Sequence, residues 1–275
     1  MKRFLIAFGL LLAVAFSLLY ITKYNYLLTG VSTIYLTGHT TAYLNDYKKF
    51  SNNSVLVSDH PQAWPLHRFY NQYSLGERRE DYLKDRKTVA YLVIKNDSIL
   101  YEKYYYGFGV DSRSNSFSMA KSVVSALMGI AIQDGAIKGL DQKVLDFIPN
   151  LQGPYAHQVT VGDLASMASG QKWSEEYYNP FSVTSASYFV KDLDALILEQ
   201  PIDEKPGKVF RYGSGTTQLL GMVIKKATGK TLSAYLSEKL WRPLGANQTA
   251  LWQLDSVENG MEKAFCCLAT NARDF

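Results

Sequence analysis

The feature that most constrains the fold is a long apolar run that opens on the tetrad Ser-Met-Ala-Lys. Ser118 and Lys121 are followed by Ser-Val-Val-Ser-Ala-Leu-Met-Gly-Ile, which predicts a helix that is apolar on nearly every side and is therefore buried. Asn115 and Ser116 offer a cap for its start. Residues three apart share a helix face, so the Ser118 hydroxyl is expected beside the Lys121 amine. Because lysine is rarely buried, Lys121 requires a partner or a function.

This pairing suits acyl transfer through a covalent serine ester. A serine becomes nucleophilic when a neighbouring base takes its proton, and a desolvated lysine can be that base. The free N–H groups at a helix start favour developing negative charge. The motif alone is weak, because it recurs as Ser169–Lys172 beside Gly170, where a helix end and a solvated lysine are expected. Only the first copy opens an apolar helix.

The N-terminus has the pattern of a membrane anchor. Lys2 and Arg3 precede residues 4–21, which carry no charge. A run of about 18 residues is near the lower limit for crossing a bilayer, and the basic flank places the rest of the chain outside the cytoplasm, on the periplasmic side. Ala13-Val14-Ala15 resembles a signal-peptidase site, but the apolar run continues beyond it. We therefore expect an uncleaved signal anchor over 1–21, with a cleaved signal peptide as the alternative.

Composition excludes several classes of partner. The 29 basic and 25 acidic residues are scattered and give a net charge of +4, so no nucleic-acid surface is predicted. The four histidines are scattered, so neither a metal site nor a cofactor is predicted. Cys266 and Cys267 are neighbours and cannot close an ordinary loop, so we expect no disulfide framework and explain both by a buried strand edge.

The remaining pattern divides the chain in three. After the anchor, residues 22–86 are expected to form an irregular extracytoplasmic stem and wrap that ends in a charged helix near 77–87. A β-hairpin is predicted for 89–106 around the Asn96-Asp97 turn. Beyond residue 107 helical patterns dominate and strands are hard to find, although a hairpin alone is marginal. The helices are expected near 160–165, 190–199, 215–228 and 231–241.

These segments together resemble the serine β-lactamase and penicillin-binding-protein superfamily. The resemblance begins near residue 87 and is to the class C-like branch, which includes family VIII esterases and 6-aminohexanoate-oligomer hydrolases. It implies an α/β (α+β) fold in 87–275, with an antiparallel sheet flanked by helices and an all-helical subdomain. The segments that carry it are 89–107, 116–122, 135–149, 160–170 and 206–215.

The resemblance also implies the site. Ser118 would be the nucleophile, and Lys121 and Tyr212 would share the base role, with Tyr212 returning a proton to the leaving group. A Tyr-x-Ser triplet means little alone, but the one at Tyr212 follows Pro-Gly and precedes a predicted helix. Ser214, Trp173 and Tyr177 are expected to bind substrate, with core packing as the alternative for the two aromatic residues.

One family motif is missing from this sequence. A late strand of such enzymes carries Lys-Thr-Gly or His-x-Gly, and neither occurs here. Residues 270–275 also resemble a helix cut in its first turns. We therefore expect a C-terminally truncated chain that lacks its last strands and has little activity, whose full-length parent is a hydrolase of an ester or amide. A β-lactam and a short amide oligomer are included among its substrates, and a non-catalytic, membrane-tethered binding protein is the alternative function.

Overall fold

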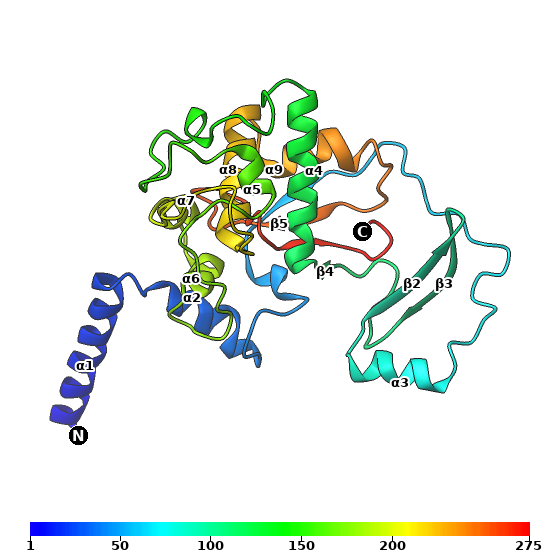
Figure 1. The fold of residues 1–275 in the computed structure, drawn as a ribbon. Coiled ribbons are helices and arrows are strands. Elements are labelled where there is room, and N and C mark those ends of the chain that lie inside the picture. The colour runs from blue at the N-terminus through cyan, green and yellow to red at the C-terminus, as the bar shows by residue number, and fades with distance from the viewer.

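The computed structural model describes residues 1–275 as helices packed on a four-stranded antiparallel sheet, with a two-stranded sheet to one side (Figure 1). The order of the larger sheet is β1-β5-β6-β4. Its strands are β1 Asn52–Val55, β4 Ser114–Asn115, β5 Ala250–Gln253 and β6 Leu268–Thr270, and the smaller sheet pairs β2 Ala90–Lys95 with β3 Ser98–Tyr104. The helices are α1 Lys2–Ile21, α2 Tyr26–Thr33, α3 Glu77–Asp85, α4 Ala120–Gln133, α5 Val161–Ala165, α6 Val183–Phe189, α7 Leu193–Leu198, α8 Ser214–Thr228 and α9 Leu232–Leu236.

The larger sheet corrects two expectations. Strands β4, β5 and β6 lie beyond residue 107, where few strands were expected, and β1 and α2 lie in the stem that was expected to be irregular. These strands have only two to four residues each. So short a segment shows no alternation of polar and apolar residues, so the sequence carries little signal for it. Pairing of Ser114 with Thr270 holds the approach to the predicted nucleophile against β6.

The predicted hairpin is confirmed as β2 and β3. Asn96 and Asp97 connect them with φ angles of 49° and 54°, as a tight hairpin turn requires. Lys103 of β3 forms an ion pair of 2.6 Å with Glu80 of α3, so the charged helix packs beside the hairpin. Figure 1 shows these three elements as a lobe beside the main body.

The expected apolar helix is present as α4, but only one of its faces is buried, whereas burial on nearly every side was expected. Val124, Leu127 and Ala131 recur at helical spacing on one face and are fully buried. This face packs against α8, which is buried from Ser214 to Ile224. The two helices and the sheet enclose the hydrophobic core.

A side chain holds the turn that precedes α4. The Asn115 carboxamide oxygen accepts a hydrogen bond of 2.9 Å from the backbone N–H of Phe117. Phe117 has a φ of 46°, which is unusual for a residue other than glycine and is typical of functional sites. The strained turn places Ser118 in a short 3-10 segment, Phe117–Met119, that leads directly into α4.

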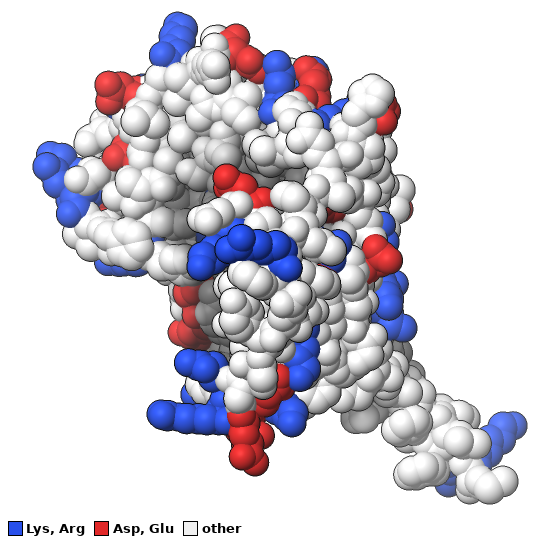
Figure 2. Space-filling view, turned by 90° about the vertical axis from the view of Figure 1, so that its right-hand side faces the viewer, with Lys and Arg blue, Asp and Glu red and all other residues white.

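Helix α1 stands apart from the rest of the chain (Figure 1). None of its residues is buried, and its mean hydropathy of 2.6 is high enough for a helix that crosses a membrane. Figure 2 shows it as a largely uncharged projection with basic atoms at its tip. On the visible face of the body, charges of both signs are interspersed, in keeping with the scattered charge of the sequence.

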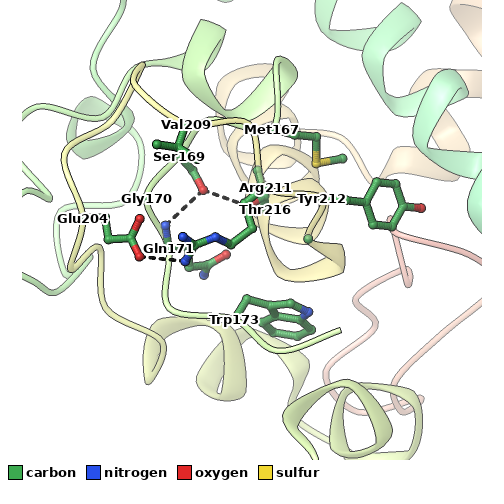
Figure 3. A pocket seen from close by; sticks show the side chains of 11 residues that line it. Met167, Ser169, Gly170, Gln171, Trp173, Glu204, Val209, Arg211, Tyr212 and Thr216 are labelled. Atoms are coloured by element: carbon green, nitrogen blue, oxygen red, sulfur yellow. Dashed lines mark hydrogen bonds and ion pairs between the residues drawn. The ribbon is translucent and has the colours of Figure 1, made fainter. Parts of the chain in front are cut away.

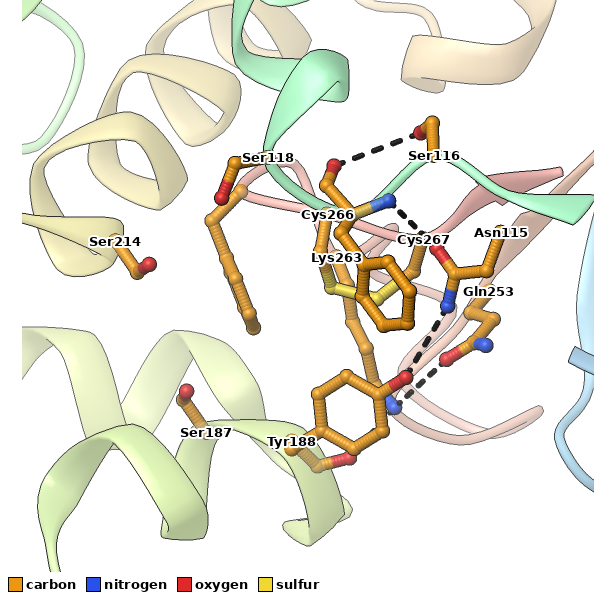
Figure 4. The surroundings of a disulfide bond; sticks show 12 residues. Asn115, Ser116, Ser118, Ser187, Tyr188, Ser214, Gln253, Lys263, Cys266 and Cys267 are labelled. Carbon is orange, nitrogen blue, oxygen red and sulfur yellow. Dashed lines mark hydrogen bonds between the residues drawn. A yellow bond between two sulfur atoms is a disulfide. The ribbon is translucent and has the colours of Figure 1, made fainter. Parts of the chain in front are cut away.

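Two C-terminal expectations need correction. Cys266 and Cys267, which precede β6 and are buried, form a disulfide with each other (Figure 4). The bridge closes no loop between distant residues, in line with the lack of a disulfide framework. Thr270 belongs to β6, and residues 271–275 form a turn rather than a helix. The Asn271 side chain accepts a hydrogen bond from the backbone of Asp274, which is a cap-like contact that explains the helical signal.

Candidate active site

The structure brings together the hydroxyl and the amine of the first Ser-x-x-Lys motif. Ser118 is exposed at the start of α4, whereas Lys121 is only 9% exposed one helical step later. The Lys121 Nζ lies 3.2 Å from the Ser118 Oγ, within hydrogen-bond distance. A reacting group could therefore reach the hydroxyl from solvent while the amine stays shielded from water.

The Lys121 amine has three hydrogen-bond acceptors. Besides Ser118, it donates to the Ser214 hydroxyl at 3.2 Å and to the backbone carbonyl of Phe265 at 2.8 Å. Ser214 begins α8, and Phe265 lies in the buried segment before β6, so three parts of the chain meet at one nitrogen. Figure 4 shows Ser118 and Ser214 on facing elements. The three acceptors match the three N–H groups of an ammonium ion.

The phenol ring of Tyr212 faces the Lys121 amine. The Lys121 Nζ is 4.9 Å from the centre of the phenol ring, within the range of a cation–π interaction. Tyr212 is 40% exposed, and its hydroxyl makes no hydrogen bond to Ser118 or Lys121. Figure 3 shows its ring pointing away from the small pocket formed by Ser169, Gln171, Trp173 and neighbouring residues.

The other three expected site residues meet at a residue that the sequence analysis did not single out. The Glu175 carboxylate accepts hydrogen bonds from the Trp173 indole at 2.6 Å and the Tyr177 hydroxyl at 2.7 Å. It also accepts bonds from the backbone N–H of Ser214, at 2.9 Å, and from the Ser214 hydroxyl. Glu175 thus joins the loop after residue 170 to the start of α8.

Glu175 and Phe265 are the residues of the candidate site that sequence reasoning missed. Glu175 lies between the two aromatic residues that were singled out, and a carboxylate beside Trp and Tyr donors was a usable signal. Phe265 acts through its carbonyl, which no side-chain pattern can indicate. Burial and then the hydrogen bond to Glu175 raise the pKa of Tyr177, so this phenol remains a donor to the carboxylate at neutral pH.

Trp173 fixes the shape of the α8 start. A Cβ atom added to Gly215 would lie 2.3 Å from the Trp173 ring, so only glycine fits beneath the indole. The indole is half-buried and packs against the hydrophobic core. One side of the ring packs on α8, and the ring also lines the small pocket (Figure 3).

The second Ser-x-x-Lys copy forms no such pair. Ser169 is buried and its hydroxyl lies 2.8 Å from that of Thr216 in α8, whereas Lys172 is exposed. Gly170 between them has a φ of 69°, a left-handed conformation that glycine adopts easily. This copy therefore holds the loop against α8 and has no nucleophile–base geometry.

Chemically, the arrangement around Ser118 can support nucleophilic substitution at an acyl carbon. It provides an accessible hydroxyl, a buried amine within hydrogen-bond distance and a phenol beside the amine. Nucleophile, base and orienting group in contact are the usual signature of covalent catalysis.

Comparison with known proteins supports the fold and the class. Residues 77–262 match the family model described as Beta-lactamase. A 6-aminohexanoate-dimer hydrolase from Paenarthrobacter ureafaciens is 27% identical over 75% of this chain and 56% of its own length. Protein flp from Staphylococcus aureus strain COL is 26% identical over 59% of this chain and 34% of its own length. The chain thus spans about half of the first relative and a third of the second.

A solved structure agrees with these matches. A Bacillus anthracis protein assigned as a 6-aminohexanoate-dimer hydrolase superposes with a TM-score of 0.72, at 22% identity, over 82% of this chain and 64% of that one. The similarity shows a shared fold. Since the family model covers more than half of its residues, this chain belongs to the β-lactamase family of the serine β-lactamase and penicillin-binding-protein superfamily.

Proposed function

We propose that this protein is a membrane-anchored serine hydrolase that cleaves an ester or amide outside the cytoplasm through an acyl-enzyme on Ser118. The single observation that carries the proposal is the 3.2 Å contact between the exposed Ser118 hydroxyl and the buried Lys121 amine. Family membership adds the expectation of hydrolysis. The name of the 27% identical relative, a 6-aminohexanoate-dimer hydrolase, favours an amide substrate.

The proposed reaction has two halves. In the first, the Ser118 Oγ attacks the acyl carbon as its proton moves to the Lys121 amine, and the leaving group departs with a proton as the acyl–enzyme bond forms. In the second, water attacks the ester, and Ser118 regains its proton as the acid product leaves. In each half, one group first accepts a proton as a general base and then donates it as a general acid, as in other reactions with general acid–base catalysis.

We assign to Tyr212 the transfer of a proton to the leaving group. Its ring lies 4.9 Å from the Lys121 nitrogen and its side chain is 40% exposed, so its hydroxyl can meet a leaving group that enters from solvent. Trp173, Tyr177 and Ser214 remain our assigned substrate-binding region, and all three are held by Glu175.

Membrane anchoring is supported by α1. The helix of 20 residues is fully exposed and apolar, with a mean hydropathy of 2.6, and the basic residues Lys2 and Arg3 lie at its N-terminal end. A basic flank stays on the cytoplasmic side, which places the hydrolase domain on the other side. We propose 1–21 as signal anchor, 22–86 as stem and wrap, and 87–275 as hydrolase domain, with β1 of the stem completing the sheet beside β5.

The test is covalent labelling. The full-length protein is incubated with a fluorophosphonate or with a penicillin, and intact mass followed by peptide mapping locates the adduct. We expect one adduct on Ser118 and none in Ser118→Ala. A folded sample without an adduct from either probe would contradict the catalytic proposal and favour a binding role. Flotation of the protein with lipid vesicles, and its loss when residues 1–21 are removed, tests the anchor separately.

A further inference from the structure

We propose that Glu175 is a positioning residue that sets the direction of the hydrogen bond between Lys121 and Ser214. By doing so it turns the lone pair of the uncharged Lys121 amine toward Ser118. The inference rests on the proposed function, because it concerns how the proposed base addresses the proposed nucleophile.

The first step is the direction of the bond from Ser214. A carboxylate can only accept hydrogen bonds. The Ser214 hydroxyl lies against Glu175 Oε1, so the single hydroxyl hydrogen of Ser214 is donated to Glu175. The backbone N–H of the same residue donates to Oε2 at 2.9 Å. Both contacts hold Ser214 with only its oxygen lone pairs facing Lys121.

The second step concerns the amine. Uncharged lysine has two N–H hydrogens and one lone pair. Ser214 oriented in this way is an acceptor, and so is the Phe265 carbonyl at 2.8 Å. The two hydrogens therefore bond to these two oxygens. The lone pair is left for the third neighbour, Ser118, which is the one group around the nitrogen whose hydroxyl hydrogen remains free to be given up.

The third step follows the proton. When the Ser118 Oγ forms its bond to the acyl carbon, its proton moves along the existing 3.2 Å contact to the Lys121 lone pair, and the carbonyl π electrons move to oxygen. The ammonium ion that results has three donors and three acceptors in place. No side chain has to turn during the step, which is the meaning of a preorganised site.

A single-atom change reverses the network. At Glu175 Oε2, two donors with fixed hydrogens converge, the Trp173 indole and the Ser214 backbone. In Glu175→Gln the amide oxygen must stay there, which puts the NH₂ group at the Oε1 position, facing the hydroxyls of Ser214 and Tyr177. The Ser214 hydroxyl then accepts, and its hydrogen turns to the Lys121 lone pair and competes with Ser118.

The experiment measures the rate of Ser118 acylation by a fluorophosphonate as a function of pH. We expect Glu175→Gln to react about 10–100-fold more slowly than wild type at the plateau, less than the about 10²–10³-fold loss found when a donor to the transition state itself is removed, because Lys121 and Ser118 are both retained. Half-maximal labelling should move to lower pH, because a negative charge two hydrogen bonds from the amine is lost. The matched control is Glu176→Gln, since Glu176 is exposed and its carboxylate accepts from the neighbouring Asn179 rather than from Ser214, and it should react within about twofold of wild type.

A double-mutant cycle separates direction from packing. If Glu175 acts through the Ser214 hydroxyl, Glu175→Gln should slow labelling much less in a Ser214→Ala background than in wild type. Equal losses in both backgrounds, or a wild-type rate in Glu175→Gln, would overturn the proposal. If the Glu175→Gln variant does not fold, neutron diffraction from crystals of the wild-type protein can locate the Ser214 hydroxyl hydrogen. A hydrogen directed at Lys121 would contradict the proposal. Absence of labelling in wild type would instead refute the proposed function.

Discussion

Lys121 and Ser214 lie 93 positions apart in the sequence, and their side chains are joined by a hydrogen bond of 3.2 Å. This contact links the start of α4 to the start of α8, so two helices that pack against each other in the core also form the site. A base fixed by rigid helices is positioned more accurately than one carried by a loop.

Replacing the buried lysine should abolish acylation. Lys121→Met keeps an unbranched apolar side chain in the same space but removes the base, and we expect fluorophosphonate labelling to fall by roughly 10²–10⁴-fold. Lys172→Met in the second Ser-x-x-Lys copy is the matched control, because Lys172 is exposed and unpaired with Ser169. Equal losses in the two variants, measured by labelling rate, would contradict the assignment.

Adding one methyl group at the start of α8 should disturb the site. In Gly215→Ala the new carbon would lie 2.3 Å from the Trp173 ring, so the indole must move away from Glu175. We expect a loss of about 1–3 kcal/mol in the free energy of unfolding and slower labelling. Gly129→Ala in α4 meets no atom within 4 Å and should stabilise by up to about 1 kcal/mol, as measured by denaturant unfolding.

The buried Lys263 predicts how stability depends on pH. Burial lowers its pKa to about 7, although Asp46 and Asp255 act in the opposite direction. Between about pH 7 and the usual lysine pKa near 10.5, the unfolded chain binds a proton that the native protein does not, so the free energy of unfolding rises with pH. Above about pH 10 it should fall again, because burial raises the pKa of tyrosines such as Tyr104, to about 12.

Lys263→Met should flatten the rise between pH 7 and 10, and thermal melts across this range measure it. The side chain donates to the Tyr188 carbonyl at 2.6 Å and covers the Phe50 ring, so the absolute stability also changes; the slope is the diagnostic quantity. Lys226→Met, at an exposed position, should leave the slope unaltered. A slope that persists in Lys263→Met would show that another group is responsible.

The contact of Arg273 with Glu102 should stabilise the hairpin lobe. Glu102 is buried and accepts from the Arg273 guanidinium, at 3.0 Å for Nε, and from the Tyr70 hydroxyl at 2.6 Å. Glu102→Ala leaves this guanidinium partly buried without its partner, and we expect a loss of about 3 kcal/mol. Glu80→Ala breaks a more exposed pair with Lys103 and should cost clearly less than Glu102→Ala, because solvent screens the exposed charges. Similar losses in urea unfolding would refute this ranking.

Much of the helical part of this structure could be predicted from local signals. The apolar run of α4, the Thr160–Asp163 capping box of α5 and the Asn96-Asp97 turn are each complete within a few residues. Likewise, the Ser118–Lys121 pairing follows from helical spacing alone. The strands β4, β5 and β6 could not be predicted, because each depends on partners far away in the sequence.

The same distinction applies to the site. Tyr212 could be found through its motif. That its ring faces the Lys121 amine could not, because this contact depends on how α8 packs against α4. Glu175 was missed because its importance lies in four hydrogen bonds, two of which come from α8, 39 positions later in the chain. The Cys266–Cys267 bond was missed because neighbouring cysteines give no loop-closing signal.

That bond has a practical consequence for how the protein can be made. A cross-link between sequence neighbours ties no separate parts of the chain together, so it removes almost none of the freedom of the unfolded polypeptide. Its formation is therefore not what holds α4, α8 and the sheet in place. Residues 87–275 should reach the same arrangement in a reducing bacterial host as in an oxidising compartment, without added oxidant.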